Sequence, residues 1–130
     1  MSKKRYHDLV VWREAHGFVL SIYKNSENFP KDELFGVTSQ LRRAAVSIPN
    51  NIVEGTTKSS VKDQLRFCEI ALGSLNECAY LLELARDLHY LTPDVYRELD
   101  DHQTRTEYLL LKFMNSKGRR FSKPLPATPS

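Results

Sequence analysis

The stretch QLRRAAVSIPNNIVEG, residues 40–55, decides the fold, because a proline at position 49 stands inside an apolar pattern of helical spacing. Apolar residues recur every three or four positions, as on one face of a helix: Leu34, Val37, Leu41, Ala44, Ile48 and Ile52. Pro49 has no N–H to donate to the carbonyl of Ala45, so it ends, begins or kinks a helix. Each of these three structures points to a different function.

Two interpretations of this stretch compete. In the first, LRRAAVSIPNNIVEG superficially resembles the turn of a helix-turn-helix repressor, with Ser47 as the cap of a recognition helix and Asn50 and Asn51 facing adenine edges. That helix would end at Gly55 after barely two turns and would carry no Lys or Arg. In the second, a single helix is kinked at Pro49. We favour the kink, because the apolar stripe keeps its register through the proline, whereas a turn would reset it.

The rest of the chain predicts three more helices and no convincing strand. The apolar spacing predicts a helix over residues 8–25, the stretch above predicts one over 34–54, and Gly55 is expected to follow its C-terminus. Ser60 is the predicted N-cap of a third helix that reaches residue 90. Thr92 is the predicted N-cap of a fourth, with Pro93 at its first position and its end near residue 115. Four helices with short connections predict an all-α, antiparallel up-down four-helix bundle.

The second and third helices each carry a second apolar stripe. In the second helix it comprises Phe35, Arg42, Val46, Pro49 and Val53, and in the third Phe67, Ile70, Ser74, Leu81, Leu84 and Leu88. One stripe suffices for a helix of a monomeric bundle, and surplus apolar surface usually marks an interface. The small residues Gly73 and Ser74 indicate a place where another helix approaches closely. The sequence therefore predicts a homo-oligomer.

Composition bounds the class of protein. The chain has 130 residues, 41% hydrophobic and 27% charged, which is ordinary for one globular domain. No apolar run approaches the roughly 20 residues of a membrane span, and the start, MSKKRYHDLVVW, is too short and interrupted in its apolar part for a signal peptide. Cys68 and Cys78 lie ten positions apart on one helix, about 15 Å at ~1.5 Å per residue, which is beyond disulfide reach. We expect a cytoplasmic protein with reduced thiols and no membrane partner.

The positive charge is concentrated at the two ends of the chain. Seven of the nineteen Lys and Arg residues lie there, and twelve remain against sixteen acidic residues in the body; the seven are Lys3, Lys4, Arg5, Lys117, Arg119, Arg120 and Lys123. An up-down bundle of four helices brings both termini to the same end. We therefore divide the chain into a basic arm at 1–7, the bundle at 8–116 and a basic, Pro-containing, disordered tail at 117–130. The resulting basic end is a candidate surface for nucleic-acid phosphates.

No catalytic or metal-binding pattern occurs in the sequence. None of His7, His16, His89 and His102 belongs to a Glu-x-x-His pair of the di-iron bundles. The zinc-protease, phosphate-loop and nucleophile-elbow motifs are absent, and the cysteines lack zinc-knuckle spacing. The sequence predicts no catalytic residues, no metal, no cofactor and no enzyme activity.

Three segments together resemble a known family, the bacterial four-helix-bundle proteins named after intervening sequences of 23S ribosomal RNA. They are DLVVWREA, FPKDELFGVTSQLRRAAVSIPNNIVEG and RFCEIALGSLNE, and the resemblance covers about residues 6–114. PNNIVEG departs from the family, which more often has a serine before the second asparagine and an alanine before the glutamate. The resemblance implies a ring-shaped homopentamer. It also implies kinship with the accessory proteins of diversity-generating retroelements, which bind nucleic acid and a reverse transcriptase.

The resemblance adds candidate RNA contacts beside the terminal patch at Arg42, Arg43, Lys58, Lys62 and Arg66. For Arg42 we favour an interface role, paired with Glu54 or Glu77 of a neighbouring subunit, over a phosphate contact. The predicted nucleic-acid-binding set is Lys3, Lys4, Arg5, Arg43, Lys58, Lys62, Arg66, Lys117, Arg119 and Arg120. The predicted oligomer interface is Phe35, Arg42, Val46, Val53, Phe67, Ile70 and Ser74.

The sequence thus favours a non-catalytic homo-oligomer that binds structured RNA, or an RNA–protein complex, through backbone electrostatics. The alternative is a protein-interaction scaffold, such as an accessory subunit of a reverse transcriptase, in which the basic termini only solubilise the chain. The helix-turn-helix DNA-binding regulator is the third hypothesis.

Overall fold

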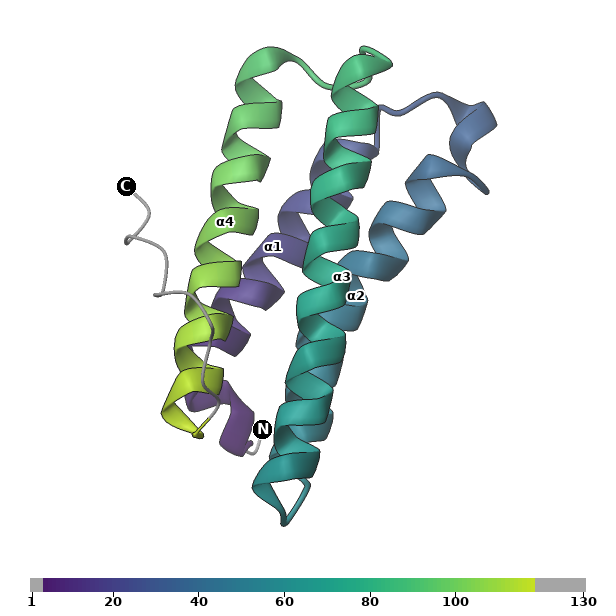
Figure 1. The fold of residues 1–130 in the computed structure, drawn as a ribbon. Helices are drawn as coiled ribbons and strands as arrows, with labels where there is room; N and C mark the ends of the chain where they lie inside the picture. Colours follow the sequence, from purple (N-terminus) through teal and green to yellow (C-terminus); the bar gives the residue numbers. More distant parts are fainter. Residues whose placement is uncertain (1–3, 119–130) are drawn as a thin grey trace.

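A computed structural model describes residues 4–118, which form four α-helices and two 3-10 helices, with no strand among them. In chain order they are η1 (Arg5–Asp8), α1 (Val10–Ser26), η2 (Lys31–Glu33), α2 (Val37–Thr56), α3 (Val61–Asp87) and α4 (Pro93–Ser116). Consecutive α-helices run in opposite directions, and each helix packs on two others (Figure 1). The all-α, four-helix prediction is confirmed.

Local capping explains where two of the helices begin. The Ser60 hydroxyl accepts a hydrogen bond from the N–H of Asp63 at 3.1 Å, and the Thr92 hydroxyl accepts one from Val95 at 3.2 Å, so both predicted N-caps are confirmed. The first α-helix starts two residues later than predicted, because Asp8 belongs to η1. The third ends at Asp87 rather than near residue 90.

The deciding stretch lies in one unbroken helix. α2 is helical from Val37 to Thr56 with Pro49 inside it, so the turn that a helix-turn-helix needs near Ser47 is absent from this region. The predicted kink at Pro49 stays a prediction. The sequence places Gly55 just beyond the helix, but the residue lies within the last turn and is buried. Its function is therefore close packing rather than helix termination.

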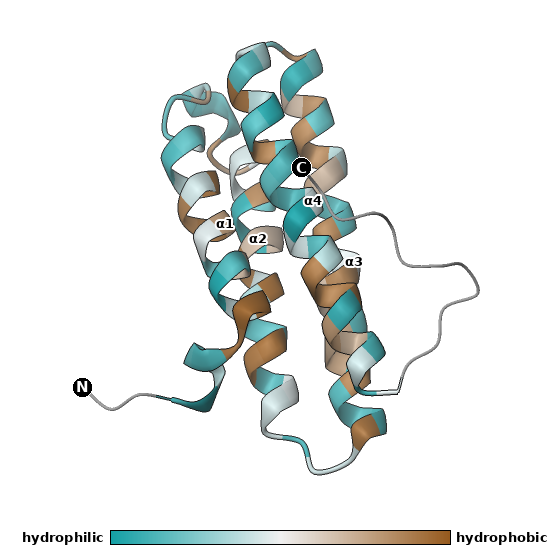
Figure 2. Ribbon diagram, turned by 90° about the vertical axis from the view of Figure 1, so that its left-hand side faces the viewer, coloured by the Kyte–Doolittle hydropathy of each residue, from teal (hydrophilic) through white to brown (hydrophobic). Residues whose placement is uncertain are grey.

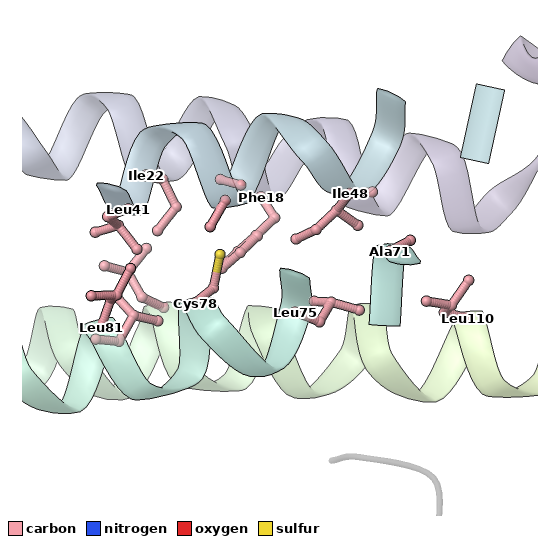
Figure 3. Close-up of a cluster of buried hydrophobic side chains, with 14 of the residues drawn as sticks. Phe18, Ile22, Leu41, Ile48, Ala71, Leu75, Cys78, Leu81 and Leu110 are labelled. Carbon is pink, nitrogen blue, oxygen red and sulfur yellow. The ribbon is translucent and has the colours of Figure 1, made fainter. Parts of the chain in front are cut away.

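The core lies between the α1–α2 pair and the α3–α4 pair. Figure 3 shows apolar side chains from all four helices meeting there, among them Phe18, Ile48, Leu75 and Leu110, each no more than 1% exposed. The sulfur of Cys78 lies in this cluster, and its burial raises the pKa of the thiol to about 12. Figure 2 shows hydrophobic and hydrophilic residues alternating along each helix, as amphipathic helices require.

The predicted stripes are buried to different extents. Most of the first α2 stripe is in the core, including Leu41, Ala44, Ile48 and Ile52. Leu34 is an exception, since it precedes the helix in a turn and is about half exposed. None of the described helices is long and apolar enough to cross a membrane.

Candidate nucleic-acid interface

Three segments far apart in the sequence meet at one end of the bundle. They are η1, the turn between α2 and α3, and the C-terminal end of α4, all at the lower end in Figure 1. Arg5 from the first and Lys117 from the last line the same cavity, which also contains Thr56 from the end of α2. The two ends of the described chain therefore come together as an up-down bundle requires.

Gln64 ties these segments to one another. Its side-chain oxygen accepts a hydrogen bond from the ammonium group of Lys117 at 3.0 Å, and its amide nitrogen donates to the backbone carbonyl of Lys58 at 2.8 Å. One side chain of α3 thus holds both the end of α4 and the turn after α2. The network therefore fixes the ammonium group of Lys117 and the backbone of the turn at Lys58.

Two basic side chains make cation–π contacts with the ring of Phe67. The ammonium of Lys58 lies 5.1 Å from the ring centroid, and the guanidinium of Arg66 lies 5.2 Å from it. Both distances are within the range of cation–π attraction. Lys117 makes a similar contact, 4.8 Å from the centroid of Phe113. Aromatic rings therefore hold several of the basic groups near one another despite their mutual repulsion.

A cavity of about 140 Å³ opens among these groups. Its lining comprises Arg5, Leu9, Ile52, Gly55, Thr56, Gln64, Cys68, Phe113 and Lys117. Burial raises the pKa of the Cys68 thiol, and the charge of Lys117 partly opposes that rise. The floor is mainly apolar, while two cations belong to the lining.

The structure brings six of the predicted nucleic-acid-binding residues to this end: Lys4, Arg5, Lys58, Lys62, Arg66 and Lys117. Lys62 and Arg66 are exposed near the start of α3, and Arg66 also approaches Asp63 at 4.0 Å. Arg43 is exposed but lies thirteen residues before the end of α2, about 20 Å away at 1.5 Å per residue, so it is not part of this group. Lys3, Arg119 and Arg120 lie outside the described residues, as does most of the predicted disordered tail.

Sequence reasoning missed the residues that organise this end. Gln64, Thr56, Leu9 and Phe113 line the cavity or bridge its walls. None of them carries a charge, and only Leu9 lies in one of the segments quoted for the family resemblance. Only Gly55 offered a signal, as a glycine followed by polar residues. A Cβ there would lie 3.3 Å from the carbonyl oxygen of Gln64, so the glycine permits the close approach of α2 and α3.

The predicted oligomer residues divide into two groups. Phe35, Val46 and Ile70 are exposed, by 93%, 40% and 46%. Arg42 instead bonds within its own chain: its Nε donates to the Ser26 hydroxyl at 2.9 Å, and its Nη2 donates to the carbonyl of Tyr23 at 3.3 Å.

Three further residues of that set also have a described environment. The Ser74 hydroxyl bonds that of Ser47 at 2.8 Å across the α2–α3 contact. Val53 and Phe67 are half-buried. Packing inside the chain therefore accounts for Arg42 and Ser74, and an interface role for them stays a prediction.

Among residues 4–118 no group of three or more His, Cys, Asp or Glu side chains could hold a metal ion. Acidic groups collect instead at the end of the bundle opposite the basic one. There, burial raises the pKa of Asp100, the neighbouring Asp101 and Glu83 raise it further, and Arg86 opposes them. Residues 24–36 and 83–101, which form that end, hold nine acidic and four basic side chains.

The fold and the basic end define a class of protein: small, all-α four-helix bundles with a cluster of cations at one end. A family model described as 23S rRNA-intervening sequence protein matches residues 7–112. The chain belongs to this family.

A solved structure agrees with that assignment. It is a protein with unknown function from the S23 ribosomal protein family of Bacteroides thetaiotaomicron, and it is 30% identical with a TM-score of 0.73. The match covers 81% of the present chain and 98% of the other. No protein with a curated description matches significantly.

Proposed function

We propose that this protein is a non-catalytic, cytoplasmic homopentamer that binds structured RNA, or an RNA–protein complex, through the phosphate backbone. One observation carries the proposal: six cations from three separate segments gather at one end of the bundle. The opposite end is acidic, so a polyanion is attracted to one end and repelled from the other. The family name of the matching model is consistent with an RNA context.

The basic end favours backbone contacts over base-edge reading. Its lysines and arginines come from a short 3-10 helix, a turn and the ends of α3 and α4, so they are spread over several elements rather than along one recognition helix. Contacts of this kind position nucleic acid without specifying sequence. Because each neutralised phosphate releases counterions, affinity falls steeply as salt concentration rises.

Assembly multiplies this surface. A pentamer would carry five basic ends, so weak phosphate contacts add through avidity. Exposed apolar residues on the second stripes, Val46 and Ile70, support an interface between copies. A Cβ added at Gly73, on the outer side of α3, would meet no atom of the described chain within 4 Å, which leaves room for a neighbouring helix. A kink at Pro49 would adapt α2 to the curvature of such a ring.

The test is fluorescence anisotropy with a labelled RNA hairpin at low and high salt. We expect the affinity to fall at least tenfold between them, since several phosphate contacts are lost to competing ions. The double variant K62Q/R66Q should weaken binding and reduce the salt slope, whereas K24Q/K31Q, with the same charge change far from the basic end, should not. Binding that ignores salt, or equal losses in both variants, would contradict the proposal.

A second candidate function is that of a protein-interaction scaffold, such as an accessory subunit of a reverse transcriptase. It is favoured by Phe35, which is 93% exposed beside the half-exposed Leu34 in the turn before α2. A protein partner that copurifies after nuclease treatment and is lost in F35S would favour the scaffold. A partner lost on nuclease treatment would favour RNA.

A further inference from the structure

We propose that the cavity at the basic end receives one unpaired pyrimidine base of the RNA, while Arg5 and Lys117 hold the adjoining phosphates. This inference rests on the proposed RNA binding and adds a base-specific site to it. Recognition of RNA bases usually involves unpaired nucleotides in loops and ends, because their edges and faces are free.

The size of the cavity selects the occupant. Its volume of about 140 Å³ is close to that of a protein cavity known to accept a benzene ring, at ~150 Å³. One six-membered ring therefore fits, and we expect a purine, which has a second fused ring, to fit less closely. Leu9, Ile52 and Phe113 supply apolar contacts for the faces of such a ring.

The polar groups in the lining match the edge of a pyrimidine. Gln64 uses one N–H toward Lys58 and one oxygen lone pair toward Lys117, so its amide retains a second N–H and a second lone pair. The Thr56 hydroxyl donates to the carbonyl of Val53 and keeps lone pairs as acceptors. Uracil presents a carbonyl oxygen beside an N–H. The free N–H of Gln64 can donate to that oxygen, and the lone pairs of Gln64 and Thr56 can accept from that N–H.

Charge completes the complementarity. Arg5 and Lys117 belong to the cavity lining. A neutral apolar ligand would leave these cations without an anionic partner, whereas a nucleotide supplies an apolar ring and an anion together. An RNA strand is therefore a better occupant than an uncharged small molecule.

The first experiment separates base from backbone. Anisotropy would compare three strands of equal length and phosphate number: one wholly abasic, one abasic with a single central uridine, and one abasic with a single central adenosine. We expect the uridine strand to bind about tenfold more tightly than the abasic strand, in line with the contribution of a stacked base. The adenosine strand should bind like the abasic strand.

Two variants locate the site. T56F would place a ring in the cavity and should abolish the uridine preference. T57F is the matched control, because Thr57 is exposed, lies outside the cavity and makes an equivalent hydrogen bond to the carbonyl three residues before it. An equal loss of the preference in both variants would overturn the assignment.

The two cysteines give a readout on the unmodified protein. Cys68 lines the cavity and Cys78 lies in the core, and both are free thiols. A uridine-containing strand should slow the modification of Cys68 by a small thiol reagent, and leave Cys78 unaffected, as mapped by mass spectrometry. Uridine and abasic strands that bind equally and do not protect Cys68 would overturn this inference and leave the proposed function standing. Binding of neither these strands nor the RNA hairpin would refute both.

Discussion

At the scale of single residues, His89 shows how one backbone conformation can end a helix. It is the one non-glycine residue with positive φ among those described, at 64°. Its N–H bonds the carbonyl of Arg86 at 2.9 Å, and the N–H of Tyr90 bonds that of Ala85 at 2.8 Å, the pattern of a Schellman motif. The left-handed position is one that glycine takes without steric cost.

Replacing His89 by glycine should therefore stabilise the protein. We expect H89G to raise the free energy of unfolding by about 1 kcal/mol, because a side chain at positive φ costs roughly that much. Urea denaturation followed by circular dichroism would measure it. H89V should move the midpoint in the opposite direction, since a β-branched residue tolerates this conformation least; a stable H89V would contradict the argument.

His102 predicts a pH dependence of stability. Burial between α1 and α4 lowers its pKa below 6.5, although Glu14, whose carboxylate lies 3.2 Å away, favours the proton and Arg105 opposes it. The unfolded chain therefore binds a proton more readily than the folded one below pH 6.5. The contribution of His102 to the free energy of unfolding is complete above pH 6.5. It is lost as the pH falls from 6.5 toward the pKa of His102 in the folded protein.

Denaturation at a series of pH values would test this expectation. The unfolding free energy of the wild type should fall from pH 7 to pH 5 more steeply than that of H102Q, whose side chain does not titrate. An NMR titration should place the His102 pKa below 6.5. Identical slopes for the two proteins would show that other groups dominate.

At the scale of the helices, α2 and α3 form the most extensive contact in the bundle. Near the turn, Gly55 lets them approach, since a Cβ would lie 3.3 Å from the Gln64 carbonyl oxygen and 3.4 Å from the Cβ of Phe67. The sequence predicts the same purpose for Gly73, but this residue is exposed, and a Cβ added to it would meet no atom of the described chain within 4 Å apart from its own stretch of helix. Gly55 and Gly73 therefore have opposite environments.

This contrast gives a matched pair of substitutions. G73A should raise the unfolding free energy by about 0.8–1 kcal/mol, the propensity difference between Gly and Ala in a helix. G55A should gain less or lose stability, because backbone atoms of α3 must move. Thermal denaturation of the two variants under conditions that keep the protein monomeric would compare them, and an equal gain in both would contradict the packing argument.

At the scale of the whole molecule, apolar surface remains outside the core. Some of it lies on the predicted interface, at Ile70, and some lies elsewhere, at Leu20 on α1, which is 58% exposed. The exposed apolar groups thus offer both a test residue and a control. If copies assemble through the second stripes, a substitution at Ile70 disrupts the assembly and one at Leu20 does not.

Light scattering would decide this. We expect the wild type to have five times the 15.0 kDa mass of the chain. I70E should lower the mass toward one chain while leaving the helical circular dichroism unchanged, because an unpaired carboxylate in an apolar interface is costly. L20E should leave the mass unchanged; dissociation by L20E alone would place the interface on α1.

Sequence by itself determined the class of fold and placed each helix boundary to within about three residues. Apolar periodicity and capping residues are local properties, so Ser60, Thr92 and the stripe through Pro49 could be interpreted without knowledge of the rest of the chain. The meeting of Arg5 and Lys117 at one end also followed from the number of helices alone. The family resemblance over residues 6–114 agrees with the matched range of 7–112.

Only the tertiary structure decided which residues meet. The bridge from Lys117 through Gln64 to Lys58, the cavity beside Cys68 and the internal partners of Arg42 all join positions distant in sequence. Helical periodicity states which way a side chain faces, but not what lies opposite it. The neighbour depends on how far α2, α3 and α4 slide and rotate against one another, and that is set by the packing of the whole core.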